Sequence, residues 1–504
     1  MARRFQLGIL FQDHMMFQIN QEITISGISN IHQMISVEFL DYVYQKEVPV
    51  GPFTICLPAV QEYFEPFEMK ISTLEEVVLL RDCIFGDIFI AGGQSNMAFV
   101  LKDCVHDELI TNPLIRYFKV PELPYEGAQH DYPWAYQDKP SWGLATLELI
   151  PWMSAIAYEV ATALFKETKR PIGIITVAMG DTSVFSWTDL MSLQGNNRLS
   201  RHLNNYQFEV EKYRSESEYT ERFHTQFPML MNFYGVIEEG VKAGLDASSA
   251  HAEAYRKYPN PYLPMGPMHH NRPSGCFDTM IKRIIPYSCK AILYYQGESD
   301  HENHRYYESA LRTMIASWRI AFEMPHVPFY LVQIAGYAYP GAKTDAIPFV
   351  RFAQQQVALK EPHVYLVSAI DQGEIDNIHP VDKRIVAKRI VDCVLEYSYG
   401  QKSDTLSPYV SDYMIQEDLI TLSIKGSTIP LVSKSGVFKG ILVSSNHQAF
   451  EEVMNVRVGN QTITFPIEKD TKEIRYLFDN APSCDIYTEH GLPLLPFRFV
   501  FDKH

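Results

Sequence analysis

Short, largely apolar runs that alternate with amphipathic segments are the feature that most constrains this chain. The apolar runs are Ile88–Ala91, Ile172–Ala178, Ala291–Tyr295, Phe329–Ala335 and Val364–Ile370. Runs of this kind are typical of strands that are buried on both faces, as in a parallel sheet. Apolar residues between the runs recur on one helix face, at 156–164 and at 306–318. The alternation predicts a doubly wound α/β domain with a parallel sheet, over about residues 86–400.

Both ends of the chain follow a period of two, which predicts β modules at 1–85 and 401–504. Apolar residues alternate in the first module, for example at Ile35, Val37 and Phe39. In the second, Gly459-Asn460 lies between two short apolar stretches and predicts a hairpin with a two-residue turn. Periodicity leaves open whether the modules form one sandwich or two. Residues 190–275 lack a strand signal and are expected to form a partly helical insertion that roofs a site.

Composition narrows the class of partner. The formal charge of −16 disfavours nucleic acid and anionic membrane surfaces as partners. The seven cysteines are scattered, without a Cys-x-x-Cys motif, and are expected to be free thiols in a reducing compartment.

We find neither a signal-peptide pattern nor about 18 consecutive apolar residues, so a cytoplasmic location is expected. The absence of a phosphate-binding glycine loop predicts no nucleotide cofactor, and His301 with His304 is too small a cluster to indicate a metal site. The oligomeric state stays open.

The residues that follow the apolar runs are the candidate site, because ligands bind outside the carboxyl ends of strands in open α/β sheets. The first run leads into Gly92-Gly93-Gln94-Ser95-Asn96-Met97. The glycines permit a tight turn that leaves Ser95 at the sheet edge, where a helix begins. The alternative is a serine that only caps this helix. Met97 replaces the last glycine of a Gly-x-Ser-x-Gly elbow, which argues against an ordinary α/β-hydrolase.

The residues that follow the later predicted strands include candidate oxyanion donors and a candidate base for Ser95. Gly180 and Gln296 follow the second and third runs and are of the types that donate hydrogen bonds in an oxyanion hole. Asp376 and His379 follow the last run, before a helix expected over Val381–Tyr397 with Pro380 in its first turn. Their spacing lets the carboxylate accept from imidazole Nδ1–H while Nε2 serves as a base. Each motif alone is weak, but together they indicate nucleophilic acyl transfer.

Three motifs carry a family resemblance. They are Gly-Gln-Ser-Asn-Met at 93–97, Tyr-Gln-Gly-Glu-Ser-Asp at 295–300 and Asp-Asn-Ile-His-Pro at 376–380. They resemble the SGNH-hydrolase signatures of the sialate O-acetylesterase group, which includes related carbohydrate acetylesterases. Similar strings, such as Asn-Arg-Pro-Ser-Gly at 271–275, extend the resemblance along nearly the whole chain.

The resemblance implies an SGNH-like α/β fold and a serine esterase that works without a cofactor through an acyl-enzyme. It implies Ser95 as nucleophile, His379 as base and Asp376 as the carboxylate that orients it. The oxyanion donors would be Gly180, Gln296 and the amide of Ser95. Further candidates for substrate contact are Gln94, Glu298 and Arg272.

The implied activity is removal of O-acetyl groups from sugars, with sialic acid as the first expectation. Xylan- or mannan-derived oligosaccharides are the alternative substrates, and a non-catalytic carbohydrate-binding protein is the rival class. His269-His270 is either a solvated loop or a substrate contact. The chain departs from the family in reading Gly180-Asp181-Thr182 where Gly-Gly-Thr is usual, so an acidic side chain is expected to border the oxyanion site.

Overall fold

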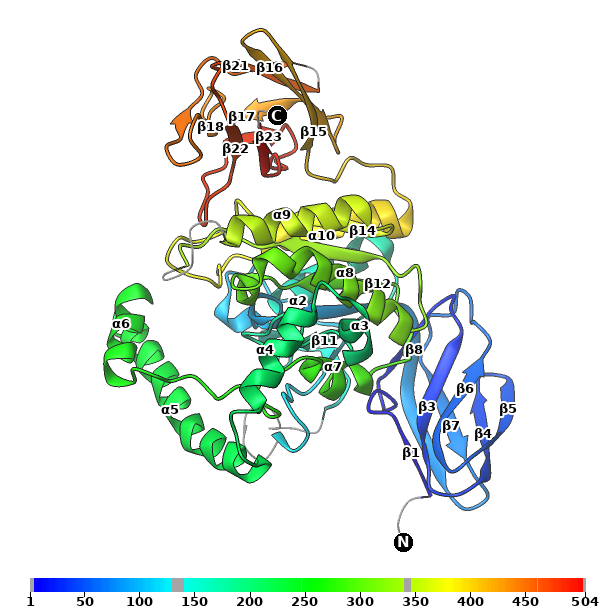
Figure 1. Cartoon of the computed structure of the whole chain (residues 1–504). Helices are drawn as coiled ribbons and strands as arrows, with labels where there is room; N and C mark the ends of the chain where they lie inside the picture. Colours follow the sequence, from blue (N-terminus) through cyan, green and yellow to red (C-terminus); the bar gives the residue numbers. More distant parts are fainter. Residues whose placement is uncertain (1–3, 129–139, 246, 340–345, 460, 502–504) are drawn as a thin grey trace. The chain divides into compact units, whose positions relative to one another are not determined.

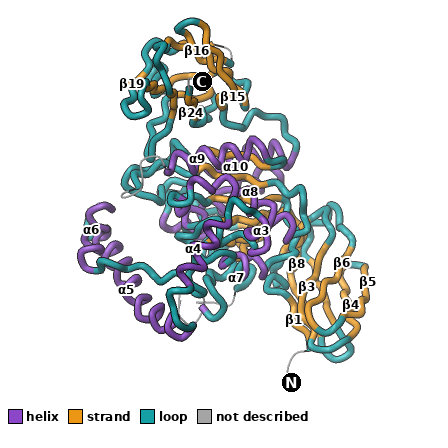
Figure 2. Tube along the Cα trace, in the orientation of Figure 1, coloured by secondary structure: helices purple, strands orange, loops and turns teal. Residues whose placement is uncertain are grey.

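A computed structural model describes residues 4–128, 140–245, 247–339, 346–459 and 461–501. The chain divides into two compact units. Unit 1 contains residues 1–223, 264–296 and 312–329, and unit 2 contains residues 224–263, 297–311 and 330–504. Figures 1 and 2 show the chain by sequence position and by secondary structure.

The N-terminal part of unit 1 is the expected β module. Its strands are β1 (Phe5–Leu7), β2 (Met16–Gln18), β3 (Ile23–Ser29), β4 (Gln33–Phe39), β5 (Tyr42–Val48), β6 (Gly51–Leu57), β7 (Phe67–Ser72) and β8 (Val77–Gly93). β3 pairs antiparallel with β1 and β6, and β4 pairs antiparallel with β5 and β7. Ile35, Val37 and Phe39 point into the core and are at most 3% exposed, which confirms the period of two.

β8 links this module to the α/β sheet of unit 1. Its first half pairs antiparallel with β7, and its later residues run parallel to β2, β11 (Ile172–Ala178) and β12 (Ala291–Tyr295). Every residue of β8 from Cys83 onward is buried. The strand therefore continues without a break across residue 85, where the N-terminal module was predicted to end. It ends at the turn that precedes Ser95.

The sheet of unit 1 has the order β10-β9-β11-β8-β12, with β9 at Asn112–Lys119 and β10 at Gly143–Ala145. Its ladders are parallel except that β10 runs antiparallel to β9, so the α/β class is confirmed and the sheet is mixed. β9 was not predicted, because Arg116 interrupts its apolar run. The Arg116 side chain is nevertheless buried, and it donates to the Asp82 carbonyl and, at 3.1 Å, to the Asp82 carboxylate.

Helices cover this sheet. Unit 1 contains α1 (Ser95–Ala98), α2 (Ala155–Thr168), α3 (Leu190–Gly195), α4 (Ser200–Val210) and α7 (Gly275–Thr279). α2 packs on β11 and begins with a cap in which Ser154 Oγ accepts from the Ala157 amide at 3.2 Å. Helices also fill the region expected to be a partly helical insertion, where α5 (Glu216–Lys242) and α6 (Ala247–Lys257) follow α4.

The α/β part of unit 2 contains β13 (Phe329–Gln333), of which Phe329 alone belongs to unit 1, and β14 (Val364–Ser368). α9 (Ala346–Lys360) and α10 (Arg384–Tyr399) pack against β14, as Figure 1 shows, and α8 (His304–Ala321) spans both units. The prediction that Pro380 lies in the first turn of a helix over Val381–Tyr397 was wrong. The Val381 amide donates to Glu374 Oε1 at 2.8 Å, which holds it in the preceding loop.

The C-terminal part of unit 2 is a β module with its own core. Its strands are β15 (Tyr409–Gln416), β16 (Leu419–Lys425), β17 (Leu431–Ser433), β18 (Ile441–Ser444), β19 (Glu451–Glu452), β20 (Arg457–Gly459), β21 (Thr462–Pro466), β22 (Glu473–Tyr476), β23 (Ile486–Thr488) and β24 (Phe497–Val500). Ile420, Ile463 and Ile474 are among its fully buried residues. The predicted hairpin is confirmed as β20–β21, but Gly459 pairs with Thr462, so Gly459 is not a turn residue. Asn460 lies outside the described residues.

All seven cysteines are free thiols, as expected. Among the described helices, none is both long enough and apolar enough to cross a membrane.

The end of β8 yields a stability prediction. Gly93 has φ +135°, and a Cβ at this position would lie 2.1 Å from the Tyr295 carbonyl oxygen. Gly93→Ala is expected to lower the free energy of unfolding by roughly 2–4 kcal/mol, because both strain and overlap oppose the methyl group. Urea unfolding measures this. Gly195→Ala is the control, since a Cβ there meets nothing within 4 Å. Equal stability of the two variants would contradict the prediction.

Candidate active site

Ser95 lies where β8 turns into α1. The Gln94 amide donates to the Tyr295 carbonyl at 3.0 Å, which fixes the turn against β12. Ser95 is half-buried and is the first residue of α1, whereas Gln94 occupies the N-cap position. No side chain caps this helix, so Ser95 is not the helix-capping serine that the sequence offered as an alternative.

Gly180 lies beside Ser95 within unit 1. The Met179 amide donates to the Gly93 carbonyl at 3.1 Å, which draws the end of β11 onto the end of β8. A Cβ placed on Gly180 would be 3.6 Å from Ser95 Cβ. The structure therefore brings together two residues that are 85 positions apart in the sequence.

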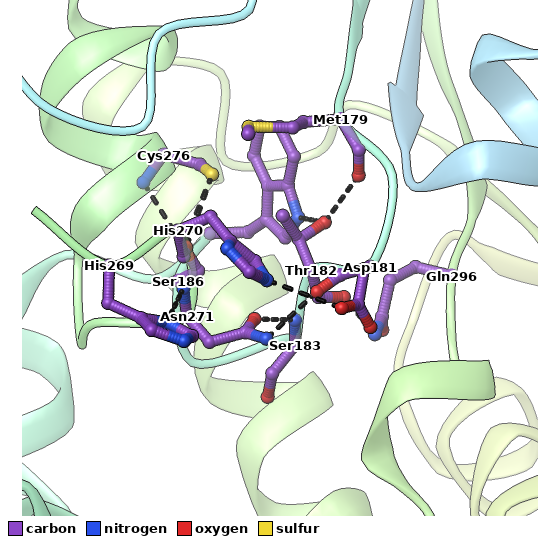
Figure 3. A network of polar contacts seen from close by, with 11 residues as sticks. Met179, Asp181, Thr182, Ser183, Ser186, His269, His270, Asn271, Cys276 and Gln296 are labelled. Atoms are coloured by element: carbon purple, nitrogen blue, oxygen red, sulfur yellow. Dashed lines mark hydrogen bonds and ion pairs between the residues drawn. The ribbon is translucent and has the colours of Figure 1, made fainter. Parts of the chain in front are cut away.

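Gln296 follows β12 and joins the same loop. Its side chain is fully buried, and Nε2 donates to the Thr182 carbonyl at 2.9 Å. The Thr182 hydroxyl in turn donates to the Met179 carbonyl at 2.7 Å and accepts from Trp187 Nε1 at 2.9 Å. Figure 3 shows Gln296 next to Asp181 and Thr182. An amide nitrogen carries two hydrogens, so the bond to Thr182 uses one of them and fixes the orientation of the side chain.

Asn271 clamps the loop from a distant part of the chain. Its Nδ2 donates to the Asp181 carbonyl at 2.8 Å, and its Oδ1 accepts from the Ser183 amide at 2.6 Å (Figure 3). Sequence reasoning did not assign this residue a role. The available signal was its place at the head of the Asn-Arg-Pro-Ser-Gly string.

The neighbouring histidines are also part of this network. His269 Nδ1 accepts from the Asn271 amide at 2.9 Å, and His270 Nε2 lies 3.4 Å from Asp181 Oδ2. Burial, followed by the charge of His270, lowers the pKa of His269 well below its usual value. Both side chains are half-buried, and their rings stack with centroids 4.3 Å apart.

The remaining catalytic candidates belong to unit 2. The His379 amide donates to Asn377 Oδ1 at 3.0 Å, and Asn377 Nδ2 donates to Glu374 Oε2 at 3.0 Å, so the loop after β14 is internally braced. Burial, and then the positive charge of Lys383, lowers the pKa of His379 to about 4. The imidazole is therefore neutral near pH 7, as a general base requires.

Asp376 is exposed in this loop. Burial and, second, the charge of Asp376 raise the pKa of the Tyr337 phenol. A carboxylate that holds an imidazole Nδ1–H raises the imidazole pKa, whereas the pKa of His379 is lowered. The role of Asp376 as orienting carboxylate stays a prediction.

The three candidates for substrate contact are largely enclosed. Gln94 and Glu298 are 2% and 4% exposed. Glu298 begins a short 3-10 helix, and its charge partly offsets the lowering of the Arg351 pKa by burial. Arg272 bonds within its own loop, to Asp278 Oδ2 at 3.4 Å and to the Gly275 carbonyl at 3.5 Å. Their contact with substrate stays a prediction.

Comparison with known proteins identifies similar chains. Residues 267–386 match the family described as "Carbohydrate esterase, sialic acid-specific acetylesterase". The sialate O-acetylesterase of Mus musculus is 22% identical over 491 residues, which cover 89% of this chain and 82% of that protein. The sialate O-acetylesterase of Homo sapiens is 23% identical over 483 residues, which cover 87% of this chain and 80% of that protein.

A solved structure agrees with the fold. A carbohydrate acetylesterase from Xanthomonas citri has a TM-score of 0.76 at 20% identity, covering 98% of this chain and 99% of that one. These findings confirm the resemblance and the fold class that the motifs predicted.

The electrostatics of His379 are directly testable. Lys383→Met is expected to raise the His379 pKa from about 4 toward 6.5, because it removes a positive charge while burial continues to favour the neutral ring. NMR titration of the imidazole carbons measures the midpoint. Lys388→Met removes an exposed lysine of α10 that pairs with Asp392, and it serves as control. A wild-type midpoint at or above 6.5, or no response to Lys383→Met, would refute this account.

Proposed function

We propose that this sialate O-acetylesterase-like chain is a carboxylic ester hydrolase that removes O-acetyl groups from carbohydrates. The proximity of Gly180 to Ser95, on a turn that only glycine at position 93 permits, is the structural observation that carries the proposal. The matched family and the similarity to sialate O-acetylesterases over most of the chain support the same chemistry.

The proposed reaction has two steps. Ser95 Oγ attacks the acetyl carbonyl carbon while His379 accepts the hydroxyl proton, and the ester C–O bond breaks as that proton passes to the departing sugar oxygen. Water, deprotonated by His379, then attacks the acetyl carbon of the acetyl-serine. The bond between that carbon and Ser95 Oγ breaks, His379 returns the proton to Ser95 Oγ, and acetic acid leaves and ionises to acetate. The Gly180 and Ser95 amides and Gln296 are proposed to stabilise the negative charge that develops on the carbonyl oxygen in both steps.

Two carbohydrate classes are candidate substrates. The names of the curated relatives favour O-acetylated sialic acid. Acetylated xylan- or mannan-derived oligosaccharides are the alternative, because sugar specificity depends on loops rather than on the shared fold. We also propose a cytoplasmic location, which the seven free thiols support.

Replacement of the nucleophile tests the proposal most directly. Ser95→Ala is expected to reduce kcat on a chromogenic acetyl ester by roughly 10⁶-fold, as in other serine triads, because the covalent step is lost. Thermal unfolding should be unchanged. Full activity of this variant would rule out Ser95, and an inactive wild type would instead favour the rival class, a carbohydrate-binding protein without catalysis.

The pH profile tests the base and its partner. Because the pKa of His379 is about 4, wild-type kcat/KM is expected to be level near neutral pH and to fall only as pH drops through about 4–5. If Asp376 orients the ring, Asp376→Asn should lose roughly 10⁴-fold in kcat, as the corresponding change does in the serine-protease triad. Near-wild-type turnover in Asp376→Asn would leave a Ser95–His379 dyad.

A further inference from the structure

Asp181 places a negative charge next to the residues proposed to bind the oxyanion. It directly follows Gly180, whose Cβ position lies 3.6 Å from Ser95 Cβ. Successive Cα atoms are 3.80 Å apart, so the Asp181 Cα lies within about 9 Å of Ser95 Cβ. A sugar whose acetyl group reaches Ser95 therefore brings its neighbouring hydroxyls close to this residue.

The backbone at Asp181 is held in a conformation that favours glycine. Its φ is +56°, in the left-handed region that asparagine and aspartate tolerate better than other residues with a side chain. The clamp from Asn271 to the Asp181 carbonyl fixes this geometry without involving the carboxylate. The side chain can therefore be varied while the backbone contacts of the loop stay intact.

The carboxylate is accessible and lies near an imidazole. Its Oδ2 lies 3.4 Å from His270 Nε2, and Figure 3 shows the imidazole directed at Asp181. The His270 side chain is 14% exposed, whereas the Asp181 side chain is 66% exposed. A carboxylate has about four lone-pair positions, so an exposed carboxylate beside one imidazole can also accept a hydrogen bond from a ligand.

We infer that Asp181 is a specificity-determining residue whose carboxylate accepts a hydrogen bond from the free hydroxyl beside the scissile ester. This rests on the proposed function and narrows its substrate class. The preferred substrates are acetylated sugars that keep a free hydroxyl on an adjacent carbon, rather than fully substituted sugars or simple alkyl and aryl acetates.

Paired substrates test this inference. The sugar is whichever of 9-O-acetyl-N-acetylneuraminic acid and methyl 3-O-acetyl-β-D-xylopyranoside the wild type deacetylates faster. It is compared with its analogue in which the hydroxyls on the adjacent carbons are methylated, and with 4-nitrophenyl acetate. Asp181→Gly removes the carboxylate from a position where glycine is unstrained, and Asp181→Asn keeps an acceptor oxygen but no charge.

For Asp181→Gly, the ratio of kcat/KM on the free-hydroxyl sugar to kcat/KM on 4-nitrophenyl acetate is expected to fall at least tenfold, which is typical for loss of a hydrogen bond to a charged group. Asp181→Asn should give a smaller fall. On the methylated analogue, Asp181→Gly and wild type should differ by less than twofold, because the hydroxyl that donates is already missing.

The control is Glu38→Gln in the N-terminal β module, where Glu38 forms a surface ion pair with Lys70 at 2.9 Å. It removes one negative charge away from the site and should leave the ratio unchanged. An unchanged ratio in Asp181→Gly, or an equal loss on free and methylated sugars, would overturn the inference while the esterase assignment stood. Absence of activity of the wild type on every ester would overturn the proposed function itself.

Discussion

The backbone hydrogen bonding of one long strand supports everything else in unit 1. β8 pairs with β7 in the N-terminal module and then with β11 and β12 in the α/β sheet, so one rigid ladder joins the two parts. Its last residue, Gly93, sits so close to the Tyr295 carbonyl that no side chain fits. The position of Ser95 therefore follows from strand pairing and from one close backbone approach.

Polar groups around the β11 loop are arranged to limit movement. Gln296, Thr182 and Trp187 form a buried chain of hydrogen bonds, and Asn271 bonds the loop on both sides of Thr182. Groups that are fixed before reaction need no reorganisation when charge develops, which is the condition for effective oxyanion stabilisation. The same hydrogen bonds fix the backbone of Asp181, whose side chain follows the proposed oxyanion residue Gly180.

Burial provides the electrostatic setting in both units. In unit 2 it lowers the pKa of His379 and leaves the ring neutral, while in unit 1 it lowers the pKa of His269 in the same way. A neutral His379 can accept a proton at neutral pH, as the proposed general base must. The proposed reaction uses the side chains of Ser95, His379 and Gln296, backbone amides and water.

The sequence by itself determined the strands that carry the site, because burial on both faces demands a continuous apolar run, as at Ile172–Ala178 and Ala291–Tyr295. It also located Ser95, Gly180 and Gln296, since each follows such a run. It did not reveal β9, because the buried Arg116 breaks the apolar pattern of that strand. It also placed the start of α10 too early, because the Glu374 side chain accepts from the Val381 amide and holds Val381 in the preceding loop. Only the tertiary structure decided that Asn271 holds the Asp181 loop. The two residues are 90 positions apart, and a hydrogen bond between such distant residues leaves no local period or motif in the sequence.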